Sequence, residues 1–112
     1  LAYLHTRTPA FAGDPALINQ IRRAAQYVTA NIAEGFEREG NREFIQFLSI
    51  AKGSVGELKD EFYTALDEGY LSESDFNCAY ATAEDTARLI GGLVSYLRRC
   101  DQTGSKFKRT TP

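Results

Sequence analysis

The sequence contains very few of the residue types on which common active sites depend. It has one histidine, His5, two cysteines, and neither tryptophan nor methionine among its 112 residues. It has no P-loop, no glycine fingerprint for a dinucleotide and no Cys-x-x-Cys pair, so it predicts no cofactor. A single histidine leaves little for histidine-assisted nucleophilic catalysis or for a histidine-rich metal site. We therefore expect a protein that is not an enzyme.

The two cysteines do not form a disulfide framework. If Cys78 and Cys100 lie on one helix, a rise of about 1.5 Å per residue places them about 33 Å apart. We therefore expect a reducing compartment, the cytoplasm. No apolar run reaches the roughly 18 residues that span a bilayer, so no membrane partner is expected. The chain starts at Leu1 rather than at methionine, and we expect the natural protein to extend further at this end.

Proline is absent between Pro15 and Pro112, and no window shows the strict apolar alternation of a half-buried strand. Apolar residues make up 43% and charged residues 25% of the chain, which is typical of a globular domain. We predict an all-α fold, an antiparallel up-and-down four-helix bundle whose first helix is short or truncated. This single domain covers residues 1–100 and is followed by a flexible basic tail at 101–112.

Apolar residues at steps of three and four predict three long helices, over residues 15–36, 41–68 and 72–100. Asp14 before Pro15, Asn41 and Ser72 are the expected N-caps of these helices, and Gly69 provides the left-handed residue with which a helix often ends. Three long helices leave one seam of a four-helix bundle uncovered. We expect a longer first helix or another subunit to fill it.

Glycine occurs inside the predicted helices, where it costs about 1 kcal/mol relative to alanine. Ser49, Gly53 and Gly56 follow each other at steps of four and three on a face away from the core seam, and Gly91 and Gly92 lie mid-way along the last helix. Because small residues let another backbone approach closely, we predict a subunit or helix contact at these five positions. Tolerated surface glycines and a ligand against the backbone remain open alternatives.

Polar residues on the mainly apolar first long helix predict a partly buried structural network. Its candidates are Arg22, Arg23, Asn31 and Glu34, together with Glu57 on the next helix. The alternative is that these side chains are the solvated part of an amphipathic helix.

Charge is distributed unevenly along the chain. Five cations follow position 97, and they are Arg98, Arg99, Lys106, Lys108 and Arg109. Against the one acid in that segment they give +4, and since the chain carries −2, residues 1–97 carry −6. Such a basic end is able to bind the phosphates of RNA or DNA, whereas a solvated end without a partner remains the other interpretation.

Several sequence blocks match a known family. They are QIRRAA at 20–25, ANIAEGF at 30–36, EFIQFLSIA at 43–51 and GYLS at 69–72. With these blocks the chain resembles the bacterial four-helix bundle proteins of the 23S rRNA intervening-sequence family.

The resemblance implies an antiparallel four-helix bundle that assembles as a homopentamer, with a largely unassigned cellular role. Some members are encoded within insertions of 23S rRNA genes. A related branch supplies the accessory protein of diversity-generating retroelements, which binds reverse transcriptase and nucleic acid through a basic surface. The resemblance therefore implies an oligomeric scaffold whose partners are copies of itself, with RNA, DNA or another protein as alternatives. It implies no catalytic residue.

Overall fold

The computed structural model describes the backbone of residues 1–110 and the side chains of residues 1–100. The elements, in chain order, are α1 (Ala2–Thr6), the 3-10 turn η1 (Pro9–Phe11), α2 (Pro15–Phe36), α3 (Asn41–Asp67) and α4 (Glu73–Thr110). The described residues contain no strand, and the all-α prediction is confirmed. None of their helices combines the length and apolar character that a bilayer span requires.

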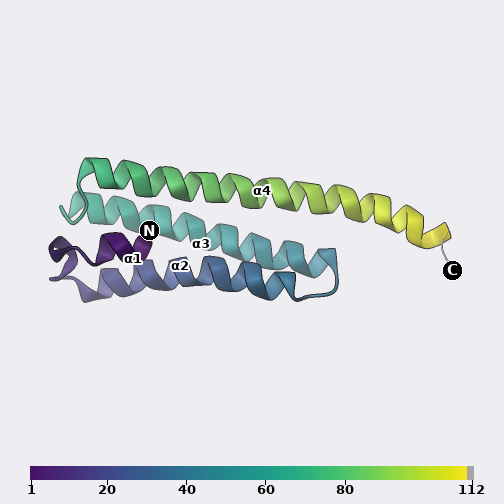
Figure 1. The fold of residues 1–112 in the computed structure, drawn as a ribbon, viewed down its shortest axis with the longest axis horizontal. Coiled ribbons are helices and arrows are strands. Elements are labelled where there is room, and N and C mark those ends of the chain that lie inside the picture. The colour runs from purple at the N-terminus through teal and green to yellow at the C-terminus, as the bar shows by residue number, and fades with distance from the viewer. Residues whose placement is uncertain (111–112) are drawn as a thin grey trace.

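The three long helices follow one another in antiparallel directions, joined by short connections (Figure 1). Helix α3 packs against α2 on one side and against α4 on the other, while short α1 packs against α2. This arrangement is the predicted four-helix bundle with a short first helix. The backbone of residues 101–110 continues α4 beyond the predicted helix end at 100, and the flexibility predicted for residues 101–112 stays a prediction.

Side-chain caps fix two of the helix starts. The Oδ1 atom of Asp14 accepts a hydrogen bond from the backbone N–H of Leu17 at 3.0 Å, and Oγ of Ser72 accepts one from the N–H of Asp75 at 3.0 Å. Both bonds satisfy backbone donors that a helix cannot satisfy by itself. The expected cap at Asn41 is wrong, because Gly40 holds the N-cap position with extended backbone and Asn41 is the first helical residue.

Helix α3 ends as the sequence predicts. Gly69 has φ +78°, a left-handed conformation that is costly for residues with a Cβ. It lets the N–H of Tyr70 reach the carbonyl of Ala65 at 2.8 Å, which satisfies an orphan carbonyl of the last turn. The chain therefore reverses into α4 within a few residues.

An aromatic contact connects this turn to the start of α2. The rings of Phe11 and Tyr70 have centroids 5.3 Å apart, and Phe11 is completely buried. The hydroxyl of Tyr70 donates to Oδ2 of Asp14 at 3.2 Å, so this carboxylate caps α2 and also binds the α3–α4 turn. Burial, followed by this hydrogen bond, raises the pKa of Tyr70.

The predicted apolar seam forms the core. Ile21 on α2 and Leu48 on α3 have no exposed surface, and Val55 on α3 is 1% exposed. At the far end Gly35 of α2 touches α3. A Cβ added to Gly35 would lie 2.7 Å from Cβ of Phe47 and 2.9 Å from Cδ1 of Phe44. Glycine at position 35 therefore allows the two helices to approach closely.

We expect Gly35→Ala to lower the free energy of unfolding by about 1–3 kcal/mol, because the added methyl overpacks the contact with Phe47. This loss opposes the gain of about 1 kcal/mol in helix propensity. Urea unfolding followed by circular dichroism measures it, with the exposed-site variant Ala33→Ser as the control. A midpoint equal to or above that of the wild type would contradict the prediction.

Candidate functional site

An apolar cavity of about 290 Å³ lies between the three long helices, beside the N-terminal end of α1. Its wall includes Val28 of α2, Val55 and Leu58 of α3 and Ala83 of α4, and Leu1 lies at its edge. Helix α1 therefore covers only part of the groove between α2 and α4. This is the seam that the helix count predicts to be uncovered.

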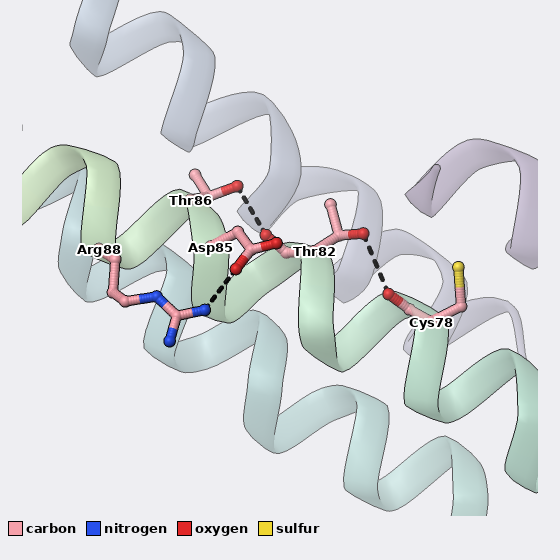
Figure 2. Close-up of polar contacts among 5 residues, drawn as sticks. All are labelled: Cys78, Thr82, Asp85, Thr86 and Arg88. Carbon is pink, nitrogen blue, oxygen red and sulfur yellow. Dashed lines mark hydrogen bonds and ion pairs between the residues drawn. The ribbon is translucent and has the colours of Figure 1, made fainter.

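The α4 wall of this groove has no unsatisfied hydroxyl at Thr82 or Thr86. Oγ1 of Thr82 donates to the carbonyl of Cys78 at 3.0 Å, and Oγ1 of Thr86 donates to the carbonyl of Thr82 at 2.8 Å (Figure 2). Such bonds to the preceding turn satisfy a hydroxyl within its own helix. Asp85 and Arg88, also drawn in Figure 2, form an ion pair on the exposed surface. The groove wall therefore suits apolar contact rather than polar recognition.

The same side of α4 continues as a second apolar stripe, which the sequence analysis missed. We define the groove stripe as the positions at steps of four and three that begin in the cavity wall, namely Thr82, Thr86, Leu89, Leu93, Tyr96 and Cys100. Leu89 is 75% exposed and Tyr96 55%. Step counting that accepts threonine as an apolar residue would have found the stripe, because its spacing is that of a helix seam.

The predicted small-residue face lies on the opposite side of the α3–α4 pair. A Cβ added to Gly53, Gly56 or Gly92 would have no other atom within 4 Å, so no packing within the chain requires glycine there. Ser49 and Gly91 come together in a polar depression of about 230 Å³. We call the exposed α3 positions Ser49, Gly53 and Gly56 the glycine face.

Arg22 ties α1 to α2. Its Nε donates to Oγ1 of Thr6 at 3.0 Å, and its guanidinium carbon lies 4.9 Å from the centroid of the Tyr3 ring. Thr6 is 3% exposed and also donates to the carbonyl of Ala2 at 2.8 Å. The guanidinium is therefore engaged in fold-stabilising contacts.

The structure does not join the five polar-network candidates into one network. Asn31 donates from Nδ2 to the carbonyl of Tyr27 at 2.8 Å, and Glu34 pairs with Arg38 at 2.7 Å on the surface. Arg23 and Glu57 are exposed. Bonds within about one helix turn satisfy Asn31 and Glu34 locally, so these two side chains do not need partners on other helices.

The basic candidates divide into two groups. Arg98 and Arg99 are exposed on α4, and Arg98 lines the polar depression beside Lys52. The other three, Lys106, Lys108 and Arg109, lie outside the described side chains.

The described residues contain no group of three or more histidine, cysteine or acidic side chains that could hold a metal ion. Glu61 on α3 was also missed by the sequence analysis. Its Oε1 is buried without a hydrogen-bond partner among the described residues. Burial, and then the charges of Glu57 and Asp60, raise the pKa of Glu61 from 4.5 to about 7.

The fold defines a class, that of small antiparallel helical bundles with an incomplete first helix. The sequence model of the family described as 23S rRNA-intervening sequence protein matches residues 2–92, and the chain belongs to this family. No curated protein and no solved structure matches the chain. The matched region ends at residue 92, before Arg98. The match therefore does not include the basic end of the chain.

Glu61 predicts a pH dependence of stability. Because its folded pKa lies above the unfolded value, the folded state binds more protons between about pH 4.5 and pH 7, and this contribution to stability is lost as pH rises through about 7. We expect Glu61→Gln to flatten the change in urea midpoint from about pH 5 to about pH 8. The exposed-site variant Glu39→Gln is the control. Parallel pH curves for wild type and Glu61→Gln would contradict the prediction.

Proposed function

We propose that this protein is a non-catalytic helical scaffold that assembles with copies of itself, as a homopentamer by family resemblance. The observation that carries the proposal is the groove stripe, an apolar face of α4 that the chain covers only in part. Leu89 at 75% exposure is the clearest case. Burying a large apolar side chain contributes about 1.5–3 kcal/mol, so a helix of a second copy laid along this stripe would be strongly favoured.

The glycine face supports the same proposal by supplying a second surface. A ring with five subunits has head-to-tail contacts, in which each subunit offers two different surfaces to its two neighbours. On α3, Val55 lines the cavity while Gly53 points about 200° away from it, because residues two positions apart on a helix differ by that angle. Open space above Gly53 and Gly56 would let a neighbouring helix approach closely. The stripe of one copy meeting the glycine face of the next would close such a ring.

Sedimentation or light scattering at high micromolar concentration tests assembly. We expect an oligomer for the wild type, and a monomer for both Leu89→Glu, which places a charge in the stripe, and Gly53→Leu, which fills the glycine face. An equimolar mixture of these two variants should form a dimer, because each retains the surface that the other has lost.

The exposed-site variant Ala30→Leu on α2 should assemble like the wild type. A wild type that is strictly monomeric would refute the proposal. An oligomer that survives Gly53→Leu would remove the glycine face from it.

The second candidate function is that of an RNA- or DNA-binding accessory protein acting through the basic residues. Two observations bear on it. Arg98 lies beside Lys52, which favours the α4 end, and Arg22 is already bound to Thr6, which disfavours Arg22 as a contributor. Cytoplasmic location and any heterologous protein partner stay predictions.

If all five cations from Arg98 to Arg109 contact a single strand, the logarithm of the affinity should fall with the logarithm of salt concentration at a slope near −3.5, from about 0.7 per phosphate. Titrating a fluorescent single-stranded RNA at several salt concentrations measures the slope. Deleting residues 106–109 should reduce it, and an unchanged slope would exclude this segment.

A further inference from the structure

The polar depression between α3 and α4 collects donors from both helices. Ser49 and Lys52 contribute donors from α3 and Ser95 and Arg98 from α4, and Gly91 and the buried Val94 complete the lining. Positions three or four residues apart lie on one side of a helix, so each set forms a line along its own helix. The two lines meet across the α3–α4 seam and border an open depression of about 230 Å³, compared with about 30 Å³ for one water molecule in the liquid.

Gly91 lies close to Lys52. A Cβ added at this position would lie 3.5 Å from Nζ of Lys52, an ordinary van der Waals distance, so the ammonium group from α3 lies beside position 91 of α4. A larger residue at position 91 would occupy the depression itself. Position 91 therefore faces another side chain, whereas Gly53, Gly56 and Gly92 have none within 4 Å of an added Cβ.

The charges of this depression are not balanced within the described part of the chain. Elsewhere among the described side chains, Arg38 pairs with Glu34 and Arg88 pairs with Asp85. Neither ion pair involves Lys52 or Arg98. No acidic residue lines the depression, although residues 1–97 carry a net −6. The rest of the surface is acidic and repels anions, so a local positive site directs an anion to the depression.

We propose that this depression binds a phosphate group. A phosphate monoester carries about −1.5 to −2 charges and three strong acceptor oxygens, which match two cations and two hydroxyl donors. The guanidinium of Arg98 offers two parallel donors, and the ammonium of Lys52 offers a compact charge. The phosphate comes from a small phosphorylated compound or from a nucleic-acid backbone, and the two sources share this chemistry.

The inference does not rest on self-assembly, because all the lining residues come from one chain. Ser49 also belongs to the glycine face, so a phosphate bound here would lie at the edge of the proposed subunit contact. Measuring binding on both the wild type and Leu89→Glu separates the two proposals. The phosphate site requires binding by the variant as well, whatever its mass.

Calorimetric titration of the full chain with inorganic phosphate, at constant ionic strength, is the direct test. We expect saturable binding that Lys52→Gln and Arg98→Gln each weaken at least about tenfold, in line with the loss of a charge-assisted hydrogen bond. Gly91→Val should abolish binding by filling the depression. Arg98→Lys should retain part of the affinity, because it keeps the charge and loses the paired donors.

Arg42→Gln, an exposed cation at the start of α3, is the matched control and should bind like the wild type. No saturable binding, or equal weakening by Arg42→Gln, would overturn the proposal. A short single-stranded RNA identifies the source. Competition between this RNA and inorganic phosphate, with both weakened by Lys52→Gln, supports the site and assigns it to a nucleic-acid backbone, whereas phosphate binding without competition supports it and assigns it to a small compound.

Discussion

Helix α3 is buried on two sides at once, and this requirement sets the position of the other long helices. On one side Gly35 of α2 lies against Phe44 and Phe47 of α3. On the other, Tyr63 of α3 packs against Phe76 of α4 with ring centroids 4.9 Å apart. With α2 and α4 both placed on α3, the groove between them is left for a further element, and five-residue α1 covers only one end of it. The uncovered groove therefore results directly from the packing of α2 and α4 on two sides of α3.

Local signals in the sequence were sufficient for the fold. The seam through Leu48 and Val55, the cap at Asp14 and the turn at Gly69 could all be predicted, because each depends on residues within a few positions of one another. The cap at Asn41 could not, since Gly40 adopts extended backbone just as well and needs no side chain.

The candidate site was harder to predict from the sequence, because its contacts connect residues that are far apart in the chain. The bond between Arg22 and Thr6 joins two helices, so spacing within α2 did not reveal it. In the sequence Lys52 looks like an ordinary surface cation. Only the packing of α3 on α4 places it beside Gly91. The groove stripe was missed in the sequence for a different reason. Threonine counts as polar in a sequence pattern, yet Thr82 and Thr86 satisfy their hydroxyls within α4 and leave an apolar wall.

The two oxygens of Asp14 bind partners at very different sequence separations. Oδ1 caps α2 through Leu17, a contact over three residues. Oδ2 accepts from Tyr70, which is 56 residues away in the chain and meets Asp14 only when α2 and α3 have closed into a hairpin. Closing a loop of this length has an entropic cost that a local helix cap does not have. A single carboxylate thus connects a contact within α2 to one across 56 residues, and it holds the start of α2 at the turn between α3 and α4.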